Sequence, residues 1–216
     1  MMFQSPPSPP CYTITLLRHG QSVGNAQGLH QGQADFPLSP RGQEQARLLQ
    51  ERWQKEGRRF DLVISSTLAR ARQTAEIIAQ GLGAPIELDS NWMERDNGQL
   101  SGLHPDQTRA SRPPFIHLYQ PIGQTGESQW ELYLRAGQAI QSLLEHTPGQ
   151  YLVVSHGAIL NMALYAILGI TPSANFIGPR FRFQNTSFAT LTYHPGEHRW
   201  TLLGINDTAH LPEAER

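Results

Sequence analysis

Apolar and β-branched residues occur along this chain in short runs, each bounded by polar or turn-forming residues. Such runs predict buried strands. They span residues 12–17, 60–65, 86–88 and 151–155. Near the end of the chain, 187–193 and 200–205 alternate between apolar and polar residues around Pro195-Gly196, which predicts a β-hairpin. The run at 151–155 is the most continuous, as expected of a strand buried on both faces.

Between these runs, apolar residues recur at helical spacing. The predicted helices span residues 40–56, 67–82, 129–146 and 159–168. Ser39 and Pro40 are typical of a helix start, and Gly57 is typical of a helix end. We expect the serines or the threonine of 65–67 to cap the second helix and Gly83 to end it.

The alternation of strands and helices predicts an α/β fold with a mostly parallel sheet. Helices would cover both faces of the sheet, and the hairpin would add edge strands. Residues 91–128 have no clear period and contain several prolines and glycines, which indicates a long loop or a small helical cap. Residues 1–10 are rich in proline and are expected to form a loose lead-in to a single domain over 11–216.

The length and composition fit one globular domain. The chain has 216 residues, of which 38% are hydrophobic and 16% charged, and its formal net charge is −1. This balance gives no sign of a nucleic acid or a membrane surface as a partner. Cys11 is the only cysteine, so an intrachain disulfide is impossible. The sequence shows neither a long apolar run nor a signal peptide, so we expect a cytoplasmic protein.

Chemically active side chains follow three of the predicted strands. Arg18 and His19 come at the end of the first strand, Arg70 lies in the helix after the second, and His156 comes directly after the fourth. Because the carboxyl ends of parallel strands meet at one edge of a sheet, we expect these side chains to share a site. Arginine pairs with phosphate oxygens, and helix N-termini at the last two junctions would add N–H donors. The sequence therefore predicts a pocket for a phosphoryl group.

A histidine in such a pocket can also act as a nucleophile. Neutral imidazole attacks phosphorus, and the resulting phosphohistidine divides a phosphoryl transfer into two easier steps. The leaving alkoxide needs a proton, which Glu94 in the irregular stretch is placed to supply. Asp96 and Glu127 are the alternatives to Glu94, and Arg72 is the alternative to Arg70. Glu127 is more simply interpreted as a charge at the start of its helix.

Several short motifs occur here in the same order as in one known family. Arg18-His19-Gly20 stands first, and Gln21–Asn25 follows it. The others are Gln31-Gly32 with Asp35, Pro37–Ser39 and Gly42; Ser65–Ala75 around Arg70; Glu94 with Gly98 and Gly102; Gly126–Ser128; Val154–Gly157; and Asn206–Leu211. Together they resemble the histidine phosphatase superfamily, which includes the cofactor-dependent phosphoglycerate mutases. The resemblance covers nearly the whole chain, with one departure at Gln21, where the family usually has glutamate.

The resemblance implies a fold and a set of site residues. The fold is a three-layer α/β/α sandwich with a mixed, mainly parallel sheet. His19 would be the nucleophile that becomes phosphohistidine, and Glu94 would act as general acid and then as base. The phosphoryl group would be held by Arg18, Arg70 and His156. Further contacts and neighbours of the site would be Asn25, Gln31, Gly32 and Gly157. The resemblance implies no metal, and no cofactor is expected.

The family contains both phosphatases and mutases. Mutases carry a longer insertion with added basic residues after the acid block, whereas 101–126 has only Arg109 and Arg112 and no lysine. Arg112-Pro113-Pro114 is faintly similar to that insertion. We therefore favour a phosphatase that acts on a small phosphorylated substrate, with a mutase as the alternative. A non-catalytic member that binds phosphorylated ligands is disfavoured, because every matched catalytic residue is present.

Two properties are left open by the sequence. The substrate depends on the irregular stretch, and sugar phosphates, phosphoglycerates, nucleotides and phosphorylated protein side chains all fit so far. The oligomeric state is open as well, although exposed edge strands of the hairpin could pair to form a homodimer.

Overall fold

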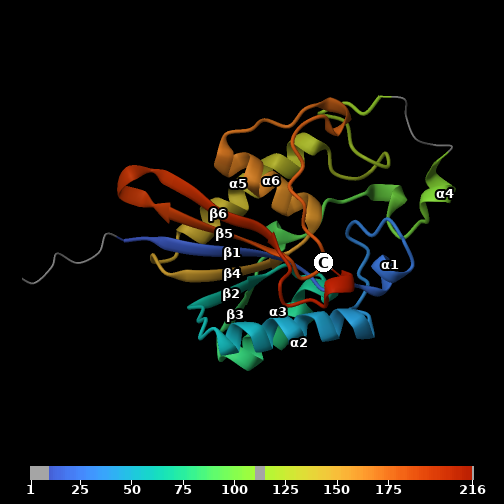
Figure 1. Cartoon of the computed structure of the whole chain (residues 1–216). Coiled ribbons are helices and arrows are strands. Elements are labelled where there is room, and N and C mark those ends of the chain that lie inside the picture. The colour runs from blue at the N-terminus through green and yellow to red at the C-terminus, as the bar shows by residue number, and fades with distance from the viewer. Residues whose placement is uncertain (1–9, 110–114, 216) are drawn as a thin grey trace, which may run out of the picture.

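The computed structural model describes residues 10–109 and 115–215. It is a sheet of six strands with helices on both faces, as Figure 1 shows. Helices α2 (Pro40–Lys55) and α3 (Ala69–Leu82) cover one face, and α5 (Gln129–Leu144) and α6 (Gly157–Leu168) cover the other. The predicted α/β sandwich is therefore confirmed. Two short helices, α1 (Val23–Ala26) and α4 (Pro105–Thr108), lie beyond the carboxyl ends of the parallel strands.

The sheet is mixed but mainly parallel, with the strand order β3-β2-β4-β1-β5-β6. The strands are β1 (Tyr12–Arg18), β2 (Leu62–Ser65), β3 (Ile86–Leu88), β4 (Gln150–Ser155), β5 (Phe188–His194) and β6 (Arg199–Asp207). The first four run parallel, β5 runs antiparallel to β1, and β6 runs antiparallel to β5. The hairpin contributes one edge strand rather than two, because β5 hydrogen-bonds to β1 on its other side.

The helix boundaries mostly follow the predicted starts and stops. The Ser39 hydroxyl caps α2 by accepting from the N–H of Gly42, and Gly83 ends α3 in a left-handed conformation at φ 68°. The expectation that residues 65–67 cap α3 is wrong. Its N-cap residue is Leu68, which has no side-chain cap; the Ser66 hydroxyl contacts the Leu68 N–H and His156, and the first helical N–H, that of Ala69, donates to Asp35.

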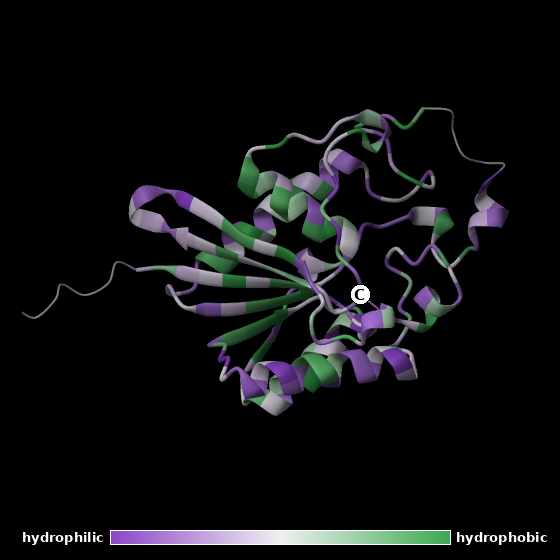
Figure 2. Cartoon of the chain, in the orientation of Figure 1, coloured by the Kyte–Doolittle hydropathy of each residue, from purple (hydrophilic) through white to green (hydrophobic). Residues whose placement is uncertain are grey.

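Two apolar cores lie on opposite faces of the sheet. One packs β1 and β4 against α5 and α6 and contains Val153 and Leu132, while the other packs β2 and β4 against α2 and α3 and contains Leu152 and Trp53. Strand β4 thus buries alternate side chains on both faces, which confirms the prediction for its continuous apolar run. In Figure 2 the apolar residues concentrate on the central strands and the inner helix faces.

The stretch between β3 and α5 contains short 3₁₀ turns at Ser90–Trp92 and Gly98–Leu100, then α4, and little other regular structure. Trp92 anchors it, since this indole is fully buried in the core of α5 and α6. The Arg112-Pro113-Pro114 motif and residues 1–9 of the predicted lead-in over 1–10 lie outside the described residues. Within the described residues, no helix combines the length and apolar character needed to cross a membrane.

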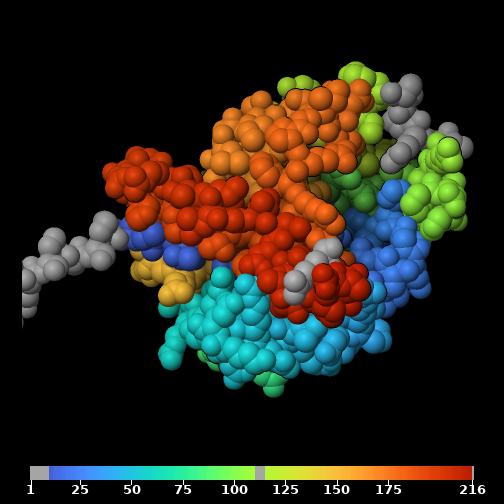
Figure 3. Space-filling model, in the orientation of Figure 1, coloured from blue at the N-terminus to red at the C-terminus, as the bar shows by residue number. Residues whose placement is uncertain are grey.

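A second irregular segment links α6 to β5 over residues 169–187 and includes a 3₁₀ turn at Ala174–Phe176. The C-terminal segment after β6 packs against the start of α2. Its Glu215 pairs with Arg41 near the start of α2 at 3.2 Å, a contact region visible in Figure 3.

Candidate active site

The carboxyl ends of β1, β2 and β4 bring four predicted side chains to one edge of the sheet. Arg18 ends β1 opposite Ser155 of β4, and the N–H of His19 donates to the Ser155 carbonyl at 2.9 Å. The rings of His19 and His156 are 5.0 Å apart. Arg70 lies in the first turn of α3, next to β2, and contacts His156. The parallel register therefore assembles residues that are more than a hundred positions apart in the chain.

Gly20 of the Arg-His-Gly motif is required for backbone packing. A Cβ atom at this position would lie 2.5 Å from the carbonyl oxygen of Gly42 in α2. The N–H of Gly20 also donates to the Thr74 hydroxyl at 3.1 Å. The loop after β1 is thus held against both α2 and α3, which fixes the direction of the preceding imidazole.

The hydrogen bonds of His19 define which nitrogen is reactive. Nδ1 lies 2.7 Å from the carbonyl oxygen of Gly20, and since a carbonyl only accepts, Nδ1 carries the proton. In the neutral ring Nε2 then has a free lone pair. This is the tautomer that a nucleophilic histidine needs.

Both imidazoles are held in the neutral form. Burial lowers the pKa of His19 well below its usual range, and the nearby guanidinium groups of Arg18 and Arg70 lower it further. Burial and Arg70 likewise lower the pKa of His156. A neutral His19 is available for nucleophilic attack throughout the neutral pH range.

The two arginines are fixed by backbone carbonyls from distant segments. Arg18 donates through Nη1 to the carbonyl of Phe183 at 2.8 Å. Arg70 donates to the carbonyls of Ala34 and Gly32 at 2.9 and 2.7 Å. Burial lowers the pKa of Arg70 to about 10, so this side chain is still a cation at neutral pH. Two positive charges therefore flank His19 without a competing ion pair from the described residues.

His156 contacts Arg70 and is not among the residues that line the cavity beside His19. The Nε of Arg70 donates to Nδ1 of His156 at 3.2 Å, so the proton of the neutral ring is on Nε2, which is 2.8 Å from the Ser66 hydroxyl. Both ring nitrogens are thus occupied. In this arrangement His156 orients Arg70, and its direct contact with a phosphoryl group stays a prediction.

Glu94 occupies the N-terminus of α6. Its carboxylate accepts from the N–H groups of Ala158 at 3.1 and 3.2 Å and of Ile159 at 3.3 Å. The N–H of Ala69 at the start of α3 is likewise taken by Asp35 at 2.6 Å. These two carboxylates therefore take several of the N–H donors that we expected the helix N-termini to offer to a phosphoryl group, and binding by the other N–H groups stays a prediction. Loop carboxylates reach them first, since the helix dipole favours negative charge there.

Arg135 of α5 holds the backbone that carries Glu94. Its guanidinium donates to the carbonyls of Asn91, Met93 and Glu94 at 2.8, 2.7 and 3.2 Å. It also forms a bidentate pair with Glu127 at 2.8 and 2.6 Å. All of the N–H groups of the guanidinium are thus used to hold the backbone of residues 91–94 in place beside Glu127.

The same contacts account for the alternatives to the predicted site residues. Glu127 pairs with Arg135 and does not cap α5, whose N-cap is Ser128. Asp96 accepts from the N–H of Gly98 at 2.8 Å within its own turn. Arg72 points outward and lies 3.7 Å from Glu76. Among these carboxylates, it is Glu94 that lines the cavity beside His19.

A cavity of about 210 Å³ lies at this edge of the sheet. The predicted site residues that line it are Arg18, His19, Asn25, Gln31, Gly32, Arg70 and Glu94. Gly157 does not line this cavity but lines a second, neighbouring one. The side-chain oxygens of Asn25 and Gln31 already accept from Ser22, so their amide N–H groups are what they offer to a ligand.

Sequence reasoning missed three contributors to the site. Asn185 donates to the His19 carbonyl at 3.0 Å and to Asn25 at 3.2 Å. Arg95 lines the cavity, and Arg135 holds the Glu94 loop. Asn185 comes from the segment before β5, which has no motif or period. Arg135 had no signal of this kind, because it acts through contacts with Glu127 and with the backbone of residues 91–94, whose positions the sequence does not fix.

Comparison with known proteins agrees with this geometry. The family model for the histidine phosphatase superfamily (branch 1) matches residues 14–208. A Yersinia enterocolitica protein named as a probable phosphoglycerate mutase, GpmB, is 33% identical over 207 residues, which cover 92% of this chain and 94% of that protein.

Solved structures give the same result. YhfR of Bacillus stearothermophilus superposes with a TM-score of 0.80 at 28% identity, over 92% of this chain and 98% of that one. A mycobacterial glucosyl-3-phosphoglycerate phosphatase, solved as a complex with VO3, gives a TM-score of 0.76 at 26% identity, over 90% and 99% of the two chains. The chain therefore belongs to the histidine phosphatase superfamily.

Proposed function

We propose that this protein is a phosphatase that hydrolyses small phosphate monoesters through a phosphohistidine on His19, without a metal. The observation that carries the proposal is the bond from Nδ1 of His19 to the Gly20 carbonyl, which leaves Nε2 unprotonated in a neutral ring. Arg18 and Arg70 flank this nucleophile as cations. A nucleophile and two positive charges around one small cavity are the parts that phosphoryl transfer needs.

In the first step Nε2 of His19 attacks phosphorus while the bond from phosphorus to the alcohol oxygen breaks. The arginines stabilise the charge on the phosphoryl oxygens. Glu94 gives its proton to the departing oxygen. In the second step Glu94 takes a proton from water, the water oxygen attacks phosphorus, and the bond to His19 breaks to release phosphate.

A phosphoglycerate mutase is the second candidate, because the curated relatives are named as probable enzymes of that kind. In a mutase the bound product takes the phosphoryl group back on another oxygen. The insertion that would bind the substrate carboxylate is poor in cations here: of its described part, 101–109 and 115–126, only Arg109 is an arginine or lysine, and it is exposed. Phosphatases also occur among the structural neighbours. These observations favour hydrolysis.

The test is to measure phosphate release from a panel of monoesters in the presence of EDTA, with the isomerisation of 3-phosphoglycerate followed in parallel. We expect release from several esters, inhibition by vanadate, and a phosphorylated His19 peptide after rapid quenching. Isomerisation primed by 2,3-bisphosphoglycerate, without net release, would establish the mutase instead. Loss of activity with EDTA would contradict the metal-free mechanism.

A further inference from the structure

A second cavity, which we call the leaving-group chamber, adjoins the cavity of about 210 Å³ beside His19, which we call the phosphoryl cavity. The chamber measures about 350 Å³ and shares Arg95 and Ala158 with that cavity. Gly157 lies at the junction, where an added Cβ would be 4.0 Å from both Nε of Arg18 and Oε2 of Glu94. A group attached to a phosphoryl at His19 and leaving past Glu94 therefore has this chamber beside it.

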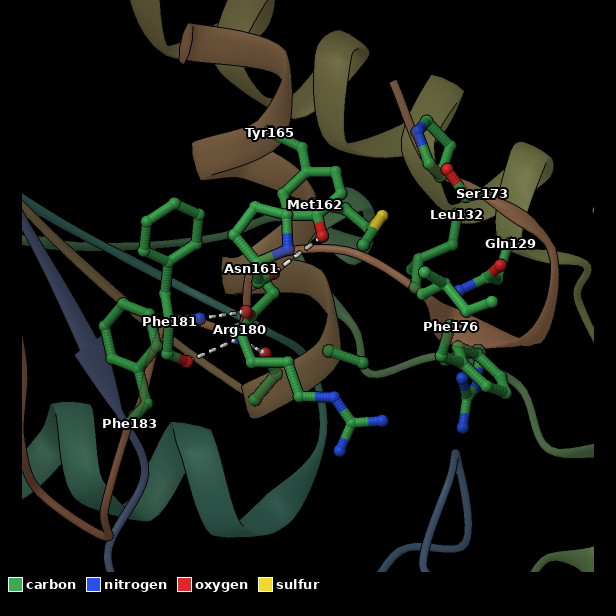
Figure 4. A pocket seen from close by; sticks show the side chains of 16 residues that line it. Gln129, Leu132, Asn161, Met162, Tyr165, Ser173, Phe176, Arg180, Phe181 and Phe183 are labelled. Carbon is green, nitrogen blue, oxygen red and sulfur yellow. Dashed lines mark hydrogen bonds between the residues drawn. The ribbon is translucent and has the colours of Figure 1, made fainter. Parts of the chain in front are cut away.

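The walls of the chamber are mainly apolar and come from three elements. Helix α5 contributes Leu132, α6 contributes Met162, and the segment between α6 and β5 contributes Phe176 and Phe181. Figure 4 shows these side chains around the chamber. Asn161 ties the last segment down by exchanging two hydrogen bonds with the backbone of Phe181, at 2.9 and 3.0 Å. The chamber has room for a bulky, largely apolar alcohol.

The charge of the chamber is one-sided. Arg95 and Arg180 line it, and none of the lining residues within 10–109 and 115–215 is an aspartate or a glutamate. Arg180 comes from the same segment as Phe181, and its side chain is exposed (Figure 4). Arg95, in contrast, is partly buried, and burial lowers its pKa despite the opposing effects of Glu94 and Glu127. The chamber thus disfavours a cationic leaving group.

Arg95 is the side chain of this wall that can recognise a particular chemical group in a ligand. Its Nε donates to Asn97 at 3.0 Å, and its guanidinium carbon lies 5.0 Å from the centre of the Phe176 ring. Its Nη1 and Nη2 have no acceptor and no ion pair among the described residues. Arg95 is partly buried at the junction of the two cavities and offers these two nitrogens as free donors, so an anionic group of a ligand would pair with them.

We infer that the substrate's alcohol is a bulky, largely apolar group with a carboxylate that binds Arg95 in the leaving-group chamber. A carboxylate is favoured over a second phosphate, because a dianion facing one guanidinium beside Glu94 would keep uncompensated charge. The inference rests on the proposed function, since it places the phosphoryl group at His19.

The test compares three matched alkyl esters: benzyl phosphate, 4-carboxybenzyl phosphate and 4-(trimethylammonio)benzyl phosphate. We expect the carboxylate to raise kcat/KM about tenfold or more over benzyl phosphate, and the cation to lower it. In Arg95→Gln the preference for the carboxylate should disappear. Arg199→Gln is the matched control for net charge, because Arg199 is exposed on the β5–β6 hairpin and pairs with Glu197.

Binding is measured separately from turnover with the corresponding phosphonates, which cannot be hydrolysed. Calorimetry should show tighter binding of the 4-carboxybenzyl compound to the wild-type protein and equal binding of the two to Arg95→Gln. Equal kcat/KM and equal binding in the wild type would overturn the inference about Arg95. Selective binding of the phosphonate without turnover of any ester would leave that inference standing and overturn the proposed phosphatase.

Discussion

The phosphoryl cavity and the leaving-group chamber share two residues but are built in different ways. The phosphoryl cavity is made by strand ends and helix starts, and its charged groups are held by backbone hydrogen bonds: Arg18 by Phe183, and Arg70 by Gly32 and Ala34. The leaving-group chamber is made by helix faces and irregular segments, and much of its wall is apolar side chain.

The difference separates two tasks. Groups that stabilise a transition state must be fixed before the substrate arrives, and the bonds to backbone provide that fixation. An apolar wall selects a substrate by its size and by the apolar surface that binding removes from water. This kind of selection does not need exact positions of the side chains, so it tolerates substitutions in the wall. We therefore expect changes in the first region to abolish turnover and changes in the second to redistribute it among substrates.

The largest expected effect is that of His19→Ala. Without the nucleophile, hydrolysis of every ester should fall by on the order of 10⁴-fold or more, and no phosphoenzyme should form. Rapid quenching followed by mass spectrometry of the peptide checks this. Circular dichroism should show that the variant is folded. A stable phosphohistidine at another position would contradict the assignment.

Glu94→Gln should have a smaller effect that depends on the leaving group. Loss of the general acid should slow alkyl esters by about 10²- to 10³-fold, while aryl esters, whose leaving groups need little protonation, should slow much less. The measurement is kcat for benzyl phosphate against 4-nitrophenyl phosphate. Equal slowing of both would count against Glu94 as the acid.

Arg135→Gln should lower the stability of the protein and should also change how the rate depends on the leaving group, as Glu94→Gln does. The side chains of Arg135 and Glu127 are 17% and 13% exposed, so an unpaired Glu127 would be left largely out of water. We expect a loss of about 3 kcal/mol in the free energy of unfolding, and an alkyl-to-aryl rate ratio shifted about tenfold in the direction of Glu94→Gln.

Two variants separate positioning from general damage in this region. Arg135→Lys keeps the charge but loses the bidentate geometry, and it should restore part of the stability and less of the rate ratio. Arg52→Gln breaks a bidentate pair with Asp207 on the other face of the sheet and should leave the ratio unchanged. A ratio that moves equally in Arg52→Gln would show that it reports only stability.

The buried histidines predict how stability depends on pH. Their pKa values are lowered in the folded state, so below about pH 6.5 the unfolded chain binds protons that the folded chain does not. The free energy of unfolding should therefore fall with acidification, by about 1.4 kcal/mol per pH unit for each histidine until its folded pKa is reached. Urea unfolding between pH 7.5 and 5.5 measures this slope, which His19→Asn should reduce.

The smallest expected effect is that of Phe176→Ala in the leaving-group chamber. Removal of the ring should raise KM for benzyl phosphate by about three- to tenfold through lost apolar contact, with little change for methyl phosphate. The two esters are compared under identical conditions. A parallel loss for methyl phosphate would place Phe176 in support of the phosphoryl cavity instead.

The sequence alone determined the fold class and most of the charged side chains of the phosphoryl cavity, namely Arg18, Arg70 and Glu94, together with His19. Side chains at strand ends are placed by the local chain direction, and parallel pairing brings those ends together. The position of Arg18 and His19 at the end of β1 and of Arg70 after β2 was therefore readable from apolar runs and short motifs. The helix start at Ser39 followed from local chemistry in the same way.

Only the tertiary structure decided the partners of these groups. That Glu94 binds the N-terminus of α6, that His156 bridges Arg70 and Ser66, and that Arg135 holds the Glu94 loop are contacts between segments far apart in the chain. The leaving-group chamber has the same origin. Part of its wall comes from irregular segments, where no period fixes which way a side chain points, so packing of these segments against α5 and α6 determines the outcome.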